Sequence, residues 1–169
     1  MADAAAAMRP AVRMNGLGLG NILTNDVFWY TPATPFLFTT GLENLQQAIP
    51  IQSDAHFICT ASMYTNTLEV GNNTATTATP YVRVLNGGAT LTLTDGGSQR
   101  FLSSANVPVS SIFGTGELPY IWPLTHLFRA NTSINISITG VGAVMAGQSI
   151  RLVFAGFKVP LNSLPQLGL

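Results

Sequence analysis

The chain has 169 residues, enough for one domain of ordinary size that buries roughly 70% of its unfolded surface. Only 8% of the residues are charged, against roughly 25% in a typical soluble domain, and seven basic residues balance seven acidic ones. This composition excludes a nucleic-acid binder, which needs a basic stripe, and a disordered chain, which is polar and charged. A net charge near zero favours association, so we expect much of the surface to be covered by partners.

Residues 1–25 are predicted to form an extended N-terminal arm, and residues 26–169 a single β-sandwich domain. The arm combines a run of alanines with Gly16, Gly18 and Gly20, and it lacks the apolar periodicity of a segment with its own core. A dinucleotide-binding loop is rejected because the spacing is Gly-x-Gly-x-Gly and no helical pattern follows. We expect these three glycines to lie at an interface with a neighbouring subunit.

An aromatic cluster follows the arm. Phe28, Trp29 and Tyr30 are large enough to anchor an interface, and they are equally suited to the core. A short strand is predicted over residues 35–39, where apolar side chains follow a proline.

One helical turn is predicted over residues 42–47, closed by Pro50. A longer strand is predicted over residues 56–64. It contains Cys59, the single cysteine of the chain, which can form neither an intramolecular disulfide nor a Cys-based metal site. The apolar residues around Cys59 indicate a small buried side chain.

Asp54 and His56 are the closest approach to a catalytic or metal-binding pattern. Residues two apart on a strand share a face, so this carboxylate is placed to orient the imidazole. A third partner is missing, and two ligands do not make a metal site. We therefore expect no catalytic residue, no metal and no cofactor, and we do not expect an enzyme.

The middle of the chain predicts a hairpin. Residues 81–85 and 90–94 alternate apolar and polar side chains on either side of Asn86-Gly87, the strongest short hairpin signal in a sequence. The preceding residues 71–79 are polar, uncharged and rich in threonine, which suits either a mobile loop tip or a loop in contact with a neutral glycan.

A strand over residues 107–113 is interrupted by Pro108. The next stretch, residues 113–128, is apolar and bounded by prolines, and it lacks the alternation of a strand. Its Tyr120 and Trp122 suit an interface anchor, a surface for stacking sugars or a cap on the core.

The last two strands are the clearest. Residues 133–139 place isoleucine at every second position between small polar residues, which predicts a strand with one buried face. Residues 149–159 are nearly continuously apolar and predict a central strand buried on both faces. Within this strand Gly156 indicates a bulge or the close approach of another backbone.

Short strands separated by turn residues, without long helices between them, predict an all-β fold, an antiparallel β-sandwich. A jelly-roll-like topology is preferred, although an immunoglobulin-like sandwich gives nearly the same pattern. No stretch reaches the roughly 18 apolar residues of a membrane helix, and the first residues lack the pattern of a signal peptide. We therefore expect the protein to be made in the host cytoplasm.

Two segments near the C-terminus resemble strands of small structural proteins in tailed-phage virions. The first, residues 127–139, contains Phe-x-x-Asn-Thr-x-Ile, and the second, residues 150–158, contains Ile-x-Leu-x-Phe-x-Gly-x-Lys. The resemblance covers about 35 residues and its motifs concern packing. It implies a β-sandwich that decorates or cements a capsid, often as a trimer or another symmetric cluster.

The functional hypothesis is therefore a virion structural protein, a decoration or cement-type minor head component that acts through oligomer interfaces and exchange of the arm. Its expected partners are further copies of itself, with a trimer favoured, and other capsid proteins. Neither nucleic acid nor a membrane is expected as a partner. The alternative is a carbohydrate- or receptor-binding module of a phage particle, built on the same sandwich, for which a glycan is the ligand.

Overall fold

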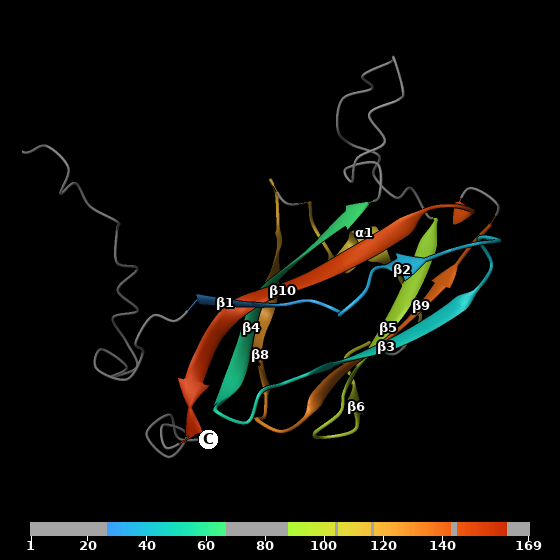
Figure 1. The fold of residues 1–169 in the computed structure, drawn as a ribbon. Coiled ribbons are helices and arrows are strands. Elements are labelled where there is room, and N and C mark those ends of the chain that lie inside the picture. The colour runs from blue at the N-terminus through green and yellow to red at the C-terminus, as the bar shows by residue number, and fades with distance from the viewer. Residues whose placement is uncertain (1–26, 67–87, 104, 116, 143–144, 162–169) are drawn as a thin grey trace, which may run out of the picture.

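The computed structural model describes residues 27–66, 88–103, 105–115, 117–142 and 145–161, which form two packed antiparallel sheets (Figure 1). Sheet A contains β1 (Val27–Tyr30), β2 (Phe36–Leu37), β4 (Ala55–Asn66), β8 (Tyr120–Phe128) and β10 (Ser149–Pro160). Sheet B contains β3 (Asn44–Pro50), β5 (Ala89–Asp95), β6 (Arg100–Phe101), β7 (Val107–Pro108) and β9 (Ser133–Gly140). A short helix, α1 (Val109–Ile112), follows β7.

The pairing of the strands is nested, and this defines the topology. In sheet A the order is β1-β10-β4-β8 with β2 also on β10, and in sheet B it is β3-β9-β5-β6 with β7 also on β5. Thus β1 pairs with β10, β3 with β9, β4 with β8, and β5 with its successors β6 and β7. Two antiparallel sheets connected in this nested way form a jelly roll. The predicted all-β antiparallel sandwich of jelly-roll type is confirmed.

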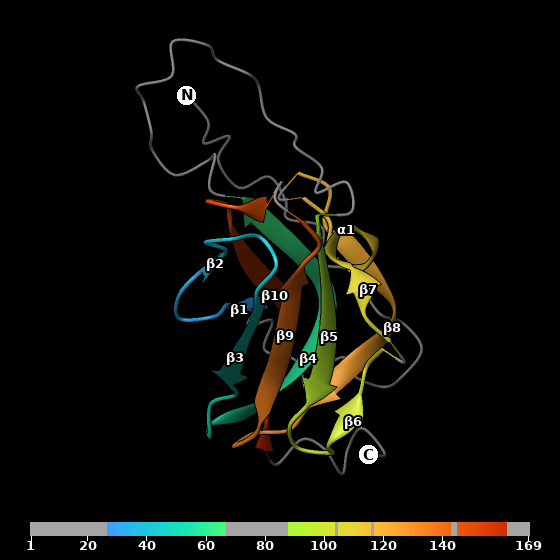
Figure 2. The same cartoon turned by 90° about the vertical axis from the view of Figure 1, so that its right-hand side faces the viewer.

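The core lies between the two sheets and consists of alternate side chains from each strand. In β9 the three isoleucines Ile134, Ile136 and Ile138 are at most 2% exposed. Strand β5 runs beside β9 (Figure 2), and its buried Leu91 and Leu93 pair with Ile138 and Ile136. Sheet A contributes large aromatic side chains. These are Phe57 of β4, Phe128 of β8 and Phe154 of β10, each fully buried. The predicted strands 133–139 and 90–94 are confirmed as β9 and β5.

The helical turn predicted over residues 42–47 is wrong, because Asn44–Pro50 form strand β3. Leu45 and Ile49 share a face and lie opposite Ile138 and Ile134 of β9. A single helical turn would bury neither side chain, whereas pairing along β9 buries Ile49 and half-buries Leu45. Pro50 is tolerated because β3 is an edge strand, where a missing N–H costs no ladder hydrogen bond.

The region after residue 107 also differs from prediction. Only Val107–Pro108 are extended, and residues 109–112 turn into α1, which buries Val109. The stretch without alternation contains strand β8. Its alternation is interrupted by a bulge. Cys59 pairs with His126 and Ala61 pairs with Ile121, so the four residues 122–125 of β8 lie opposite the single residue of β4 between these pairs.

The strands predicted over residues 56–64 and 149–159 are confirmed as β4 and β10, but only one face of β10 is buried, whereas burial of both faces was predicted. The register between these strands shifts at Ala155/Gly156, so Gly156 lies at a bulge. A Cβ at Gly156 would lie 1.9 Å from the carbonyl oxygen of Ile58, so only glycine fits there. Residues 81–85, the first half of the predicted hairpin, and the loop 71–79 lie outside the described residues, as does the arm 1–25.

Candidate interaction surface

The outer face of sheet A is apolar in consecutive rows across all its long strands. Cross-strand partners share a face, so the register gives each row directly. One row contains Val27, Phe157, Ile58 and Leu127, from β1, β10, β4 and β8 in turn. The next contains Trp29, Ala155, Ala61 and Ile121 from the same four strands. These two rows define what we call the sheet A face.

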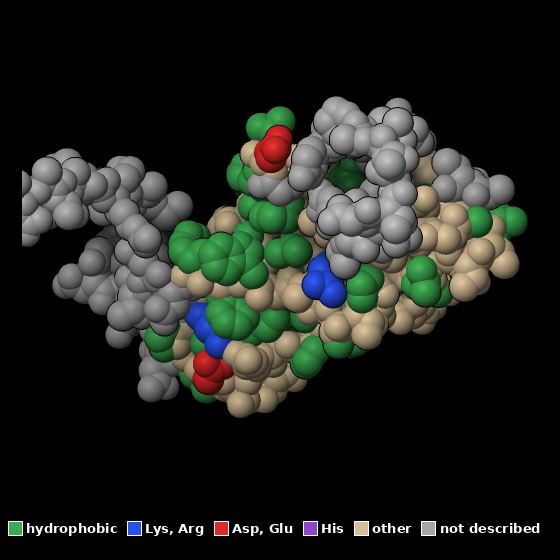
Figure 3. All heavy atoms as spheres, turned by 45° about the horizontal axis from the view of Figure 1, so that its top comes forward, with side chains coloured by type: hydrophobic (Ala, Val, Ile, Leu, Met, Phe, Trp, Pro, Cys, Tyr) green, Lys and Arg blue, Asp and Glu red, His purple; other side chains and the backbone are tan. Residues whose placement is uncertain are grey.

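The sheet A face continues along β4 and β10 with Met63 opposite Val153. Only then does a charged side chain enter, because Arg151 lies opposite Thr65. Several members of the face are widely exposed, with Trp29 57% and Ile121 66% accessible. Figure 3 shows hydrophobic side chains gathered on one part of the surface, with few charged side chains among them. Contiguous exposed apolar patches of this kind mark interaction sites.

The predicted aromatic cluster on β1 divides between the core and this face. Tyr30 is buried, packs edge-on against Phe57, and its hydroxyl accepts a hydrogen bond from the Gln52 N–H at 3.2 Å. Phe28 is half-buried, with the Lys158 ammonium 4.3 Å from its ring centre. Trp29, between them, points to the outer face because successive side chains of a strand alternate.

The second predicted cluster lies on β8, at the opposite edge of sheet A from β1. Trp122 is half-buried against the core, and its Nε1–H donates to the Ser62 Oγ at 2.9 Å. Tyr120 pairs with Ser62 and is also half-buried. These contacts make Trp122 a cap on the core. Gly16, Gly18 and Gly20 lie outside the described residues.

The residues that join the two edges, Ile58 on β4 and Val153 and Phe157 on β10, were missed as candidates. Their signal was present in the sequence, because β4 and β10 are nearly continuous apolar runs. Such runs are typical of strands buried on both faces. Within the described ranges only one face of these strands meets the other sheet, and the second face forms the surface described above.

The sequence pair Asp54 and His56 does not form a joint site. Asp54 pairs with the Lys158 ammonium at 3.0 Å, which lowers the pKa of its carboxyl. The Nδ1 of His56 instead accepts the Ala130 N–H at 3.1 Å. Burial is the main cause that lowers the pKa of His56, and the positive charge of the nearby Arg129 lowers it further. The neutral imidazole is therefore favoured.

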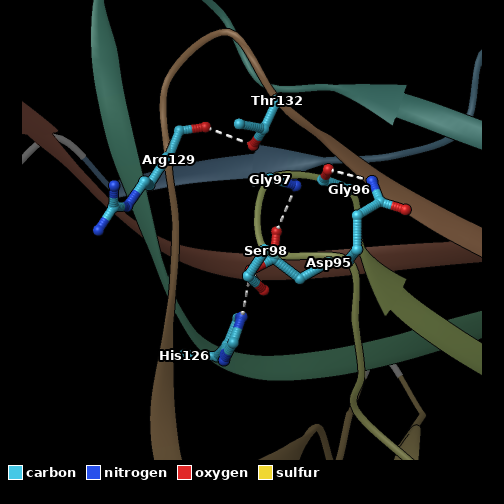
Figure 4. A network of polar contacts seen from close by, with 8 residues as sticks. Asp95, Gly96, Gly97, Ser98, His126, Arg129 and Thr132 are labelled. Atoms are coloured by element: carbon cyan, nitrogen blue, oxygen red, sulfur yellow. Dashed lines mark hydrogen bonds and ion pairs between the residues drawn. The ribbon is translucent and has the colours of Figure 1, made fainter.

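An unpredicted polar pair, Asp95 and His126, connects the end of β5 with β8 (Figure 4). Asp95 accepts hydrogen bonds from the Gly97 N–H at 2.9 Å and the Ser98 hydroxyl at 2.6 Å, and its Oδ2 lies 3.3 Å from His126 Nε2. Burial alone would raise the pKa of this carboxyl, but the three hydrogen bonds outweigh it and lower the pKa. The pair lies 31 residues apart in sequence, so no local motif reveals it.

The geometry gives little scope for chemistry in the described part of the chain. Cys59 is fully buried, as predicted, and burial raises the pKa of its thiol to about 12, so it stays protonated. Within the ranges that the structure covers, no group of three or more His, Cys, Asp or Glu side chains is placed to hold a metal ion. In the same ranges no helix has the length and apolar character needed to cross a membrane.

Comparison with known proteins returned no matching family model, no matching curated protein and no matching solved structure.

Proposed function

We propose that the protein is a virion structural subunit, a decoration or cement-type minor capsid component, and that the sheet A face is its principal contact with other subunits. The proposal rests on one observation, the rows of apolar side chains that cross this face over four strands, from Trp29 on β1 to Ile121 on β8. Jelly rolls are common in viral capsids, but the fold alone does not decide function.

The chemistry of the face fits a stable, symmetric assembly. Interfaces that never separate resemble a core cut in half and are depleted of lysine and glutamate. The chain has one lysine, Lys158, whose ammonium is bound to Asp54, and charged residues make up only 8% of the whole sequence. Covering the sheet A face with a second subunit gives β4 and β10 the two-sided burial that their sequences favour.

The arm is proposed to extend this interface. In sequence the arm directly precedes β1, an edge strand of sheet A that contributes Val27 and Trp29 to the sheet A face. Small and apolar residues suit strand addition to a neighbour's sheet, which needs only backbone groups. Deleting residues 1–25 should abolish assembly and leave the far-ultraviolet circular dichroism of the domain unchanged. Assembly that survives the deletion contradicts this role of the arm.

The assembly part of the proposal is tested by light scattering of the full chain over a hundredfold range of concentration. The expected result is a closed oligomer, with a trimer favoured. Ile121→Lys and Trp29→Lys place a charge on exposed positions of the sheet A face, so they should fold normally and shift the midpoint of association at least roughly tenfold upward. Thr92→Lys on sheet B is the matched control and should associate like the unchanged chain.

Two outcomes contradict the assembly proposal. One is a monomer at every concentration, and the other is association that Ile121→Lys and Trp29→Lys leave unchanged. The virion part has its own test, which is mass spectrometry of particles banded from cells that carry the gene. The protein should be present at a fixed ratio to the major particle proteins, and its absence from the particles contradicts the virion role.

A further inference from the structure

The outer face of sheet B has a chemistry opposite to that of sheet A. Its rows follow from the register of β3, β9, β5 and the strands beyond. The first row contains Asn44, Thr139, Thr90 and Pro108, the second Gln46, Ser137 and Thr92, and the third Ala48, Asn135, Thr94 and Phe101. No charged residue occurs in these rows, and every polar one carries a hydroxyl or a carboxamide. We call these three rows the sheet B face.

Several polar groups of the sheet B face are free to bind a ligand. The Asn44 carboxamide is occupied, since it donates to Thr139 and accepts from Ser137 and Gln46. Within the part of the chain that the structure describes, the hydroxyls of Thr92 and Thr94 make no hydrogen bond. Hydroxyls both donate and accept, so they can match a ligand that also carries groups of both kinds.

Thr92 and Thr94 line a shallow hollow of about 440 Å3 that crosses β3, β9 and β5 and ends at β6. Gln46 and Asn135 also line it, each with one hydrogen bond to a neighbouring side chain, and Phe101 lies at the β6 side. Phe101 is 71% exposed, although it pairs with Thr94 within the sheet. The width from β3 to β6 is three strand spacings, about 14 Å, which suits a short chain of rings.

We propose that the sheet B face binds a neutral oligosaccharide. Such a ligand carries many hydroxyls and no charge, and one side of each sugar ring presents C–H groups that pack on an aromatic ring. Thr92, Thr94 and Gln46 offer the hydroxyl and amide partners, and Phe101 offers the exposed ring. The three rows contain no cationic side chain that could bind a nucleic acid or an acidic glycan. They also contain no row of apolar side chains on which an apolar protein segment could pack.

This site is independent of the sheet A face, because the two lie on opposite sides of the sandwich. A symmetric assembly through sheet A would leave several sheet B faces open and display them together. Multivalent display raises avidity for a repeating glycan without any new contact. A subunit of this kind can therefore hold a particle to a polysaccharide-coated surface by many weak contacts.

The test is affinity electrophoresis of the full chain in gels that contain a soluble neutral polysaccharide. Dextran, starch, galactomannan and xyloglucan form the probe set, with the acidic polygalacturonate as the charged comparison. We expect retardation by at least one neutral polymer and none by polygalacturonate. Phe101→Ala should weaken binding roughly tenfold, and Thr92→Val, which keeps the shape and removes the hydroxyl, should weaken it several-fold.

Matched controls separate this site from the rest of the molecule. Leu124→Ala removes an equally exposed apolar side chain from β8 and should bind like the unchanged chain. Thermal unfolding of each variant excludes a loss of fold as the cause. The proposal is overturned if none of the four neutral polymers is bound, if polygalacturonate is bound equally well, or if Phe101→Ala and Thr92→Val bind normally. Trp29→Lys should lose only the avidity of the assembly and keep a retardation that Phe101→Ala abolishes in the same background, so this proposal and the assembly proposal can fail separately.

Discussion

The outer faces of the two sheets differ in composition although both belong to one small sandwich. In sheet B, β9 reads Ser-Ile-Asn-Ile-Ser-Ile-Thr, with every isoleucine inside and every polar residue outside. In sheet A, β10 reads Leu-Val-Phe-Ala-Gly-Phe, with apolar residues on both sides. The same protein therefore presents one face that suits water or a hydroxylated ligand and one that suits another protein.

This difference shows what the alternation of apolar and polar residues along a strand indicates, namely whether one or both of its faces are covered. A strand with one wet face needs polar residues at every second position, and a strand covered on both faces does not. β4 and β10 have the sequences of strands covered on both faces, yet among the residues that the structure describes one face of each has no sheet opposite it. The missing cover is what we assign to a neighbouring subunit.

The largest expected effect is a loss of folding stability in β10, the central strand of sheet A, that the corresponding substitution in β9 of sheet B does not cause. Gly156→Val in β10 should lower the free energy of unfolding by more than the ~1–3 kcal/mol usual for overpacking, because its Cβ would meet the backbone oxygen of Ile58. Ser137→Val in β9 is the control. It faces outward, loses only the hydrogen bond to Asn44, and should change stability by less than ~0.5 kcal/mol. Equal losses in urea unfolding contradict the close approach at Gly156.

A second pair of substitutions compares a buried position with an outward one. Ile136→Ala removes a side chain that is 2% exposed between the sheets and should cost ~2–5 kcal/mol in urea unfolding. Val153→Ala on the sheet A face should cost less than ~1 kcal/mol in the monomer and should weaken assembly measurably. If Val153→Ala leaves the association midpoint unchanged, this position lies outside the interface.

The polar connection between the sheets predicts a smaller effect that depends on pH. Asp95→Asn should lower stability by ~1–3 kcal/mol at pH 7, because the charged carboxylate accepts three hydrogen bonds in a buried setting. The folded-state pKa of Asp95 lies below its usual value of 3.8, so this stability is present above that pH and is lost as the pH falls through the folded pKa. Unfolding curves of the two proteins should therefore converge in acid. A difference that persists well below pH 3.8 contradicts the assignment.

The smallest expected effect concerns the thiol of Cys59, which should not react in the folded protein. Cys59 lies in the core of sheet A with a thiol pKa of about 12, so the native chain should not react with an aromatic disulfide reagent at pH 8. The thiol should become reactive only after unfolding in guanidinium chloride. Rapid modification of the native chain contradicts the burial of β4.

The sequence predicted the strands whose residues signal burial locally, such as the alternating β9 and the long β10 with its bulge at Gly156. It failed for β3, where Leu42 and Leu45 have helical spacing and the decisive partner, β9, lies about 90 residues away. It also missed the path from Trp29 to Ile121, because strand order brings together residues from four distant segments. The exposed ring of Phe101 had no local signal, since its neighbours across the sheet come from β5 and β9.

The two faces should differ most clearly in the assembled protein, where the sheet A face is covered while the sheet B face stays open. Single cysteines at Ala155→Cys and Thr92→Cys report on the two faces, because native Cys59 is buried and gives little background. Their rates of thiol modification are measured as the protein concentration rises a hundredfold. We predict that Ala155→Cys becomes protected as the oligomer forms and that Thr92→Cys keeps its rate. Equal rates at every concentration, or protection of Thr92→Cys alone, would contradict the account.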